Sequence, residues 1–247
     1  MSAGLELGAM ASESGSLIRT VDRDGVRVVS FARPPMNAID RSLVMALGAC
    51  VEDAADSAAC RAVVLTGDPP AFSAGIDIKA VPAYDAATRA DMIRRINRCV
   101  LQFYGLPKPT VAAINGHALG AGLVLALACD FRLAAAGSYR LGLTEVTAGV
   151  PFPAAPLLVV QAELDHDVAR RLSLSGAVFG PEDPFATSFI DDVVPRDQLI
   201  ERAIERAASA ARAPAYAAVK RQLRAATLER IADVVQRDAD PLLAGWI

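Results

Sequence analysis

The sequence has little of what a metal, redox or nucleic-acid site requires. It contains only two histidines, His117 and His166, which cannot form a histidine-rich metal centre. The four cysteines have no CxxC or similar spacing, which favours reduced thiols of a cytosolic protein over metal ligands or disulfides. With 25 basic and 28 acidic residues, the net charge of -3 provides no basic excess for nucleic acid. We therefore expect no metal and no nucleic-acid partner. The cysteines are Cys50, Cys60, Cys99 and Cys129.

No stretch of the sequence is long and apolar enough to be a membrane anchor. The most apolar run, Ala118–Cys129, contains two glycines and falls short of the about 20 residues that a bilayer requires. Residues 1–16 have neither the basic start nor the apolar stretch of a signal peptide, so we interpret them as a disordered leader. These absences predict a soluble, cytoplasmic protein with no membrane partner.

Apolar residues, in contrast, are abundant. They make up 53% of the 247 residues, and the mean hydropathy is +0.32. A chain of this length can bury a large core. Because the apolar content is high for a soluble monomer, we also expect apolar surface to be buried between subunits.

Strand-like and helix-like segments alternate along residues 17–247, and no low-complexity linker divides them. β-Branched and apolar runs predict strands, whereas apolar residues at helical spacing and an Asp40 cap predict helices. This alternation argues for a layered α/β fold without specifying which one. The predicted strands cover residues 26–31, 62–66, 110–115, 131–135 and 139–141, and the predicted helices 40–53, 85–104, 120–129, 196–212 and 215–237.

Two glycine-containing turns are candidates for a functional site. They cover residues 71–79 and 115–122, and the second opens a helix. The first N–H groups of a helix have no intrahelical partner and lie at the positive end of its dipole. Two such N–H groups directed at one oxygen form an oxyanion hole. For either turn alone, an ordinary tight turn is the better interpretation.

Taken together, the two turns, AFSAGIDIK and INGHALGAGLVLALACDFRLA, resemble the crotonase (enoyl-CoA hydratase/isomerase) superfamily. The resemblance extends from residues 33–38 to the C-terminal part of the chain. It implies an α/β spiral of ββα repeats with an acyl-CoA site in residues 17–190, and a helical trimerisation region in residues 191–247. It also implies a homotrimer or homohexamer that acts on an acyl-CoA thioester.

The resemblance assigns the oxyanion hole to the backbone N–H groups of Ile76 and Ala121. The family usually has glycine at the second of these positions. Alanine keeps the N–H, so the difference matters only if that residue needs a positive φ.

The carboxylates at the expected positions indicate which reaction to expect. Hydratases of this family use two glutamates, and the positions that match them here are Val124 and Glu145. Valine cannot transfer a proton, so hydration by the usual mechanism is not expected. One carboxylate suits allylic proton transfer, in which Glu145 moves a proton from C2 to C4 of a 3-enoyl thioester. The sequence around Glu145, and residues 236–240, are similar to mitochondrial-type Δ3,Δ2-enoyl-CoA isomerases.

Other functions remain open at this point. One is a hydratase or a thioester hydrolase with altered acid and base residues, and another is an acyl-CoA-binding protein without turnover. Without the family resemblance, Glu145 is better interpreted as a surface acid near a helix start.

Family analogy also gives expectations for the binding of coenzyme A, which belongs to the substrate, so no separate cofactor is expected. The backbone around Asn37 and Ala38 and that of residues 76–79 are expected to hold the adenine. Lys79 and Lys220 are candidates for the phosphates, although solvated surface lysines are the alternative. The predicted CoA-binding residues are Asn37, Ala38, Asp77, Ile78, Lys79 and Lys220.

For four further features the resemblance gives no firm role. Asp77 is better interpreted as a turn or cap residue than as one that orients a reactant, and Asp130 as structural. His117 lines the pocket or, in the better interpretation, is packed or bonded to the backbone. Residues 151–153 (Pro-Phe-Pro) depart from the family pattern and are expected to reshape the acyl pocket.

Overall fold

The computed structural model describes residues 16–247, so the predicted leader lies outside the described residues except for Ser16. The chain begins with four successive ββα units. The units are β1 (Ile18–Arg23), β2 (Val26–Phe31) and α1 (Arg41–Asp56); β3 (Ala62–Gly67), β4 (Ala71–Ser73) and α2 (Ala86–Tyr104); β5 (Thr110–Ile114), β6 (His117–Leu119) and α3 (Ala121–Ala128); and β7 (Phe131–Ala135), β8 (Leu141–Gly142) and α4 (Glu145–Ala148).

The remaining elements complete the helical layer and the main sheet. They are α5 (Ala154–Glu163), α6 (His166–Ser175), β9 (Asp192–Val194), α7 (Leu199–Ala210) and α8 (Tyr216–Arg237). Short 3-10 helices occur at Val81–Ala83, Pro184–Ser188, Arg196–Gln198 and Pro241–Ala244. None of the described helices is both long and apolar enough to cross a bilayer.

The repeated units wind the chain through two sheets. The main sheet has the order β1-β2-β3-β5-β7-β9, with β1 antiparallel to β2 and the other pairs parallel. The smaller sheet has the order β4-β6-β8, and both of its pairs are parallel. The second, third and fourth units each place one strand in each sheet. The predicted α/β spiral of ββα repeats is therefore confirmed.

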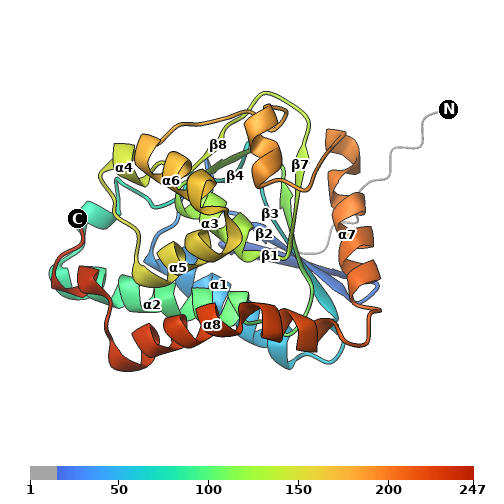
Figure 1. Cartoon of the computed structure of the whole chain (residues 1–247), viewed down its shortest axis with the longest axis horizontal. Helices are drawn as coiled ribbons and strands as arrows, with labels where there is room; N and C mark the ends of the chain where they lie inside the picture. The colour runs from blue at the N-terminus through green and yellow to red at the C-terminus, as the bar shows by residue number, and fades with distance from the viewer. Residues whose placement is uncertain (1–15) are drawn as a thin grey trace.

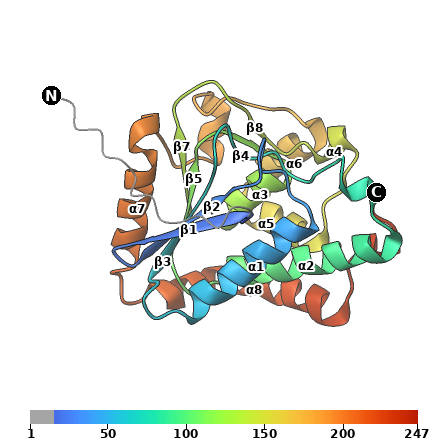
Figure 2. The ribbon, with the colours of Figure 1, turned by 180° about the vertical axis from the view of Figure 1, so that it is seen from behind.

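Helices cover both faces of the main sheet. Helix α7 lies on one face, and α1, α2, α3 and α5 lie on the other, with α8 running along α2 and α5 (Figures 1 and 2). Strands β3 and β5 are buried at every position, which suits sequences whose only polar side chains are Thr66 and Thr110.

Helices α1 and α2 form where the sequence predicts them, because their caps and apolar faces are local features. The Asp40 side chain accepts a hydrogen bond from the Leu43 N–H at 2.8 Å, and Asp85 accepts one from Thr88 N–H at 2.7 Å. Helix α1 buries Leu43, Leu47 and Val51 on its predicted face.

The C-terminal region differs from the prediction in two ways. The expected boundary at residue 190 falls just before β9, so the main sheet continues into the C-terminal region. Apolar spacing predicts the helix over residues 215–237, but the buried residues of α8 are Lys220, Arg224 and Ile231. Two of these three are charged, so α8 is attached to the core by ion pairs as well as by apolar packing.

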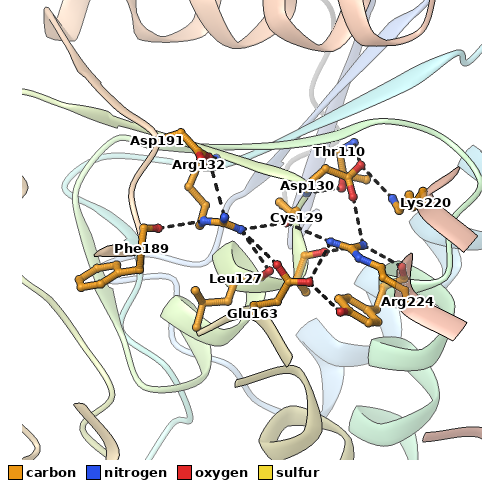
Figure 3. Close-up of polar contacts among 12 residues, drawn as sticks. Thr110, Leu127, Cys129, Asp130, Arg132, Glu163, Phe189, Asp191, Lys220 and Arg224 are labelled. Atoms are coloured by element: carbon orange, nitrogen blue, oxygen red, sulfur yellow. Dashed lines mark hydrogen bonds and ion pairs between the residues drawn. The ribbon is translucent and has the colours of Figure 1, made fainter. Parts of the chain in front are cut away.

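These ion pairs form a buried network at the C-terminal end of α3 (Figure 3). The Asp130 carboxylate lies 2.9 Å from Lys220 Nζ and 3.0 Å from Arg224 Nη1. Arg224 also pairs with Glu163 at 3.3 Å, and Tyr216 donates its hydroxyl to Asp130 at 2.9 Å. Charges removed from water require such partners, so the predicted structural role of Asp130 agrees with its contacts.

Candidate active site

The small sheet brings three distant segments of the chain to one place. Strands β4, β6 and β8 are parallel neighbours, so their carboxyl ends lie at the same edge of the sheet. The chain leaves β4 toward Gly75 and Ile76, leaves β6 toward Gly120 and Ala121, and leaves β8 toward Glu145. The residues that the sequence predicts as catalytic therefore come together through the pairing of three short strands.

The two glycine turns are in direct contact. A Cβ atom added to Gly75, whose φ is +81°, would lie 2.6 Å from the Leu119 carbonyl oxygen and 3.2 Å from the Ala121 nitrogen. Only glycine allows both this backbone conformation and this close approach. The contact places the backbone that follows Gly75 beside the first residue of α3.

The N–H groups of Ile76 and Ala121 have no acceptor within residues 16–247. Around Ile76, the pairing with Ile39 uses the neighbouring groups instead: Ile39 N–H donates to Gly75 O at 2.7 Å and Asp77 N–H donates to Ile39 O at 2.8 Å. Ala121 is the first residue of α3, where an N–H has no intrahelical partner. Two unpaired N–H groups on touching turns can donate to a single substrate oxygen.

Gly120 holds the strained position of the second turn, and Ala121 does not. Gly120 has φ +51° and ψ −126°, a conformation that side chains disfavour, whereas Ala121 is not among the residues with positive φ. The alanine therefore replaces the usual glycine of the family without backbone strain. A Cβ on Gly120 would also lie 3.3 Å from Glu145 Oε1, which places this carboxyl group directly over the turn.

Glu145 is a buried acid without a charged partner. The residue is 8% exposed, and its Oε2 atom has no hydrogen-bond partner within residues 16–247. Burial raises the pKa of Glu145 from 4.5 to about 7, although a hydrogen bond from its own backbone N–H acts in the opposite direction. A carboxyl group with a pKa near 7 can both accept and return a proton at neutral pH.

Two hollows meet at Glu145. One is an apolar cavity of about 50 Å³ between α1, α2 and α3, and the other is an open cleft of about 440 Å³. Ile76, Ala121, Glu145 and Val150 line both of them. An elongated substrate with an apolar end and a polar end can therefore place its middle at the two unpaired N–H groups.

The apolar cavity has no second carboxylate. Val124 is 2% exposed and lines the cavity at the position where the family's hydratases carry a glutamate. Within residues 16–247, Glu145 is the only acid in the lining. Residues Pro151–Pro153 also line the cavity, so this segment contributes to its shape as expected.

Most of the residues predicted to bind CoA lie in or near the open cleft. Ala38, Asp77, Ile78 and Lys79 line it. The Asp77 carboxylate accepts hydrogen bonds from the N–H groups of Lys79 at 3.0 Å and Ala80 at 2.9 Å, so Asp77 acts as the cap of a turn.

Asn37 does not line the cleft. It is 1% exposed, and its side-chain amide donates to the carbonyl oxygens of Asp68 and Ala71 at 2.9 and 2.8 Å. Asn37 therefore holds the loop behind the cleft together.

The prediction that Lys220 binds a CoA phosphate is wrong. Its side chain is 7% exposed, and its ammonium group is shared between Asp130 at 2.9 Å and the Lys108 carbonyl oxygen at 3.0 Å. It does not line the cleft. The sequence shows that a helix carries a lysine, but it does not show whether tertiary packing buries that lysine.

The structure adds Arg33 to the cleft, a cation that the sequence interpretation did not select. Its guanidinium pairs with Asp77 at 2.7 Å and Asp40 at 3.2 Å while the residue lines the cleft. The signal that could have identified it is its place at the start of the Arg-Pro-Pro-Met-Asn-Ala motif. His117 lies outside both hollows, and its Nδ1 accepts a hydrogen bond from Arg140 N–H at 3.3 Å.

Comparison with known proteins agrees with this geometry. The family model described as enoyl-CoA hydratase/isomerase matches residues 22–242. The chain belongs to the enoyl-CoA hydratase/isomerase family. It is 31% identical over 220 residues to human mitochondrial enoyl-CoA delta isomerase 1, covering 87% of this chain and 72% of that protein. It is also 34% identical over 180 residues to the probable enoyl-CoA hydratase EchA17 of Mycobacterium tuberculosis, covering 72% and 68%.

Solved structures of the same family share the fold. Human mitochondrial delta3-delta2-enoyl-CoA isomerase superposes with a TM-score of 0.84 at 29% identity, covering 91% of this chain and 88% of that one. The probable enoyl-CoA hydratase EchA3 of Mycobacterium tuberculosis gives 0.82 at 28% identity, covering 91% and 95%. Relatives described as an isomerase and as a probable hydratase are about equally similar in sequence to this chain, and EchA3 itself is described as a hydratase in one solved structure and as an isomerase in another, so the reaction must be argued from the site.

Proposed function

We propose that this protein is a Δ3,Δ2-enoyl-CoA isomerase. The observation that carries the proposal is one buried carboxylate, Glu145, beside two unpaired backbone N–H groups, with Val124 in place of a second acid. Water addition by the two-carboxylate mechanism requires a second acid or base. Double-bond migration requires one group that takes a proton and gives it back.

In this mechanism Glu145 removes a proton from C2 of a 3-enoyl-CoA. The electron pair of the broken C–H bond first forms the C1=C2 bond of a dienolate. When the proton returns, the former C3=C4 pair forms the new C–H bond at C4, and the C1=C2 pair becomes the C2=C3 double bond. The thioester oxygen carries the negative charge of the dienolate and accepts hydrogen bonds from the N–H groups of Ile76 and Ala121. Removing one donor of this kind costs about 2.7–4 kcal/mol of transition-state stabilisation in acyl transfer.

The two hollows fit the two ends of the substrate. The apolar cavity suits the acyl tail, because Glu145 is the only charged side chain in its lining among the described residues. The open cleft suits coenzyme A, with Arg33, Lys79 and the backbone of residues 76–79 in its lining. Coenzyme A is part of the substrate in this proposal, and no further cofactor takes part.

Parallel assays of a 3-enoyl-CoA and a 2-enoyl-CoA test the proposal, with double-bond migration and water addition followed separately. We expect rapid migration and slow or undetectable hydration. In D2O, the product formed during the first turnovers should carry little deuterium at C4, because the buried carboxyl group shields the proton from solvent. Robust formation of 3-hydroxyacyl-CoA would overturn the proposal in favour of a hydratase. Tight acyl-CoA binding without turnover would indicate a binding protein.

We also propose that the protein assembles as a homotrimer or a dimer of trimers. The supporting observation is an apolar strip on α8, where Val219 is 56% exposed and Leu223, one turn later, is 83% exposed. Light scattering should give a mass three or six times that of the 25.8 kDa chain, and Leu223→Glu should lower it. A monomer at micromolar concentration would contradict this assembly. The cytoplasmic location stays a prediction from the sequence.

A further inference from the structure

The apolar cavity is followed by a second, smaller one of about 10 Å³, deeper in the core. Among the described residues, Leu47 alone lines both, and it is 4% exposed. Leu47 therefore lies where the two cavities adjoin. The second cavity is lined by Val29, Leu47, Cys50, Val51, Ala54, Val63, Leu65, Phe103 and Leu106.

The two cavities follow one another along α1. Leu43 and Val44 line the first cavity, Leu47 lines both, and Val51 and Ala54 line the second. Because each helical residue advances about 1.5 Å, this order describes a path along the helix axis.

Helix α2 shows the same order. Ile96, Cys99 and Val100 line the first cavity, and Phe103, one turn further along, lines the second. On both helices the earlier residues line the cavity that Glu145 also lines, and the later residues line the cavity beyond Leu47.

We propose that Leu47 is the end wall of the acyl site and sets the longest straight acyl chain that the protein accepts. This inference rests on the proposed function, because it takes the first cavity as the acyl site. The first cavity is small, about 50 Å³, so the tail that it holds is short. The terminal methyl group of the longest accepted chain contacts Leu47.

Binding of saturated straight-chain acyl-CoAs tests this inference without any turnover. Each methylene group that enters the cavity contributes about 0.8 kcal/mol, so the dissociation constant measured by calorimetry should fall about fourfold per added carbon. For the wild-type protein this improvement should stop at the chain length that reaches Leu47. For Leu47→Ala it should continue over at least two further carbons.

Val51→Ala is the matched control, because Val51 lines the second cavity only. It removes core volume from the same helix, and its chain-length profile should match that of the wild type. The double variant should accept longer chains than Leu47→Ala alone, since Val51 becomes exposed to the ligand only after Leu47 is truncated. If Leu47→Ala does not fold, Leu47→Val should move the limit by about one carbon.

An unchanged limit in a folded Leu47→Ala or Leu47→Val variant would overturn the proposal, and so would a Val51→Ala variant that moves the limit by itself. Loss of all chain-length dependence would show that the tail binds elsewhere. Failure of the isomerase assay leaves these binding profiles unaffected, so the two proposals are tested separately.

Discussion

The two ends of α3 present two kinds of buried acid. At the N-terminal end, Glu145 lies over Gly120, and its Oε2 atom has no partner within residues 16–247. At the C-terminal end, Asp130 is paired with Lys220 and Arg224 and accepts a further hydrogen bond from the Thr110 N–H at 2.8 Å (Figure 3). Glu145 is 8% exposed and the Asp130 side chain 9%, but only Asp130 is paired.

The presence or absence of cationic partners gives Asp130 and Glu145 different roles. Lys220, Arg224 and the Tyr216 hydroxyl all contact Asp130, so this carboxylate joins α8 to the core. Glu145 lacks such cations, and desolvation alone raises its pKa to about 7. A buried acid in this protein is therefore a candidate base where partners are missing and a structural group where they are present.

The backbone of α3 follows the same division. Its C-terminal carbonyl groups are occupied: Arg132 donates to Cys129 O at 3.1 Å, and Arg224 donates to the same oxygen at 3.3 Å. Cations at this end stabilise a helix dipole. At the N-terminal end, the Ala121 N–H stays unpaired. The helix is anchored at one end and free to bind a substrate oxygen at the other.

The largest effect is expected at the unpaired acid. Glu145→Gln keeps the shape of the side chain but removes the base, so isomerase turnover should fall by about 10²–10⁴-fold or more, because a placed general base contributes that much. Acyl-CoA binding measured by calorimetry should stay within a modest factor. A variant that retains most of its turnover would return Glu145 to a structural role and abolish the contrast with Asp130.

At the paired acid, the expected effect is on stability. Asp130→Asn leaves Lys220 buried without its counter-charge and leaves Arg224 with Glu163 alone, which should lower the free energy of unfolding by about 3–5 kcal/mol. Urea unfolding measures this change. The control is Asp167→Asn, which breaks an exposed pair with Arg170 and should barely move the midpoint, because exposed pairs contribute little. If both substitutions have equal effects, the network of Figure 3 does not hold α8.

A third variant tests the free end of α3. Ala121→Pro removes one unpaired N–H from the first helical position, where proline is well tolerated. Turnover should fall by about 10²–10³-fold with little change in binding, because the lost hydrogen bond strengthens as charge develops on the thioester oxygen. Circular dichroism must first show an intact fold. Unchanged turnover in a folded protein would exclude the Ala121 N–H from the reaction.

The smallest expected effect is the change in stability on Glu145→Gln, whose sign is opposite to that expected for Asp130→Asn. The pKa of Glu145 is about 7 in the folded protein and ordinarily 4.5. The ionisation of Glu145 therefore takes no free energy from folding below pH 4.5, and this cost grows as the pH rises to 7. Above pH 7, Glu145→Gln should therefore stabilise the protein by up to about 3 kcal/mol. The gain should vanish near pH 4, as measured by unfolding across this range. A destabilised variant at pH 8 would show that the Glu145 carboxylate has a partner after all.

Local features of the sequence predicted much of the fold. The Asp40 cap and the apolar face with Leu43 and Leu47 located α1, because capping and helical periodicity depend on near neighbours. Predominantly apolar and β-branched runs likewise located β3 and β5. The strands β4 and β6, with three residues each, were missed, because too few residues carry a pattern and parallel pairing joins distant segments.

Family resemblance carried the prediction of the site further than any local pattern. It placed Ile76, Ala121 and Glu145 together, and the structure brings the three to one edge of the small sheet. It did not prevent the wrong prediction for Lys220, because no nearby residue in the sequence indicates that this lysine is buried against Asp130. Arg33 was missed because its place in the cleft depends on pairing with Asp40 and Asp77.

The sequence by itself determined the positions of α1, α2, β3 and β5, the two glycine turns, and the absence of a carboxylate at Val124. Each of these is a property of one residue or of near neighbours. Tertiary structure alone decided that Glu145 lacks a partner, that Asp130 has several, and that Leu47 lies where two cavities adjoin. The physical reason is that proton affinity and free volume depend on which distant groups surround a side chain, and in this fold the pairing of β4, β6 and β8 and the packing of α8 set those surroundings.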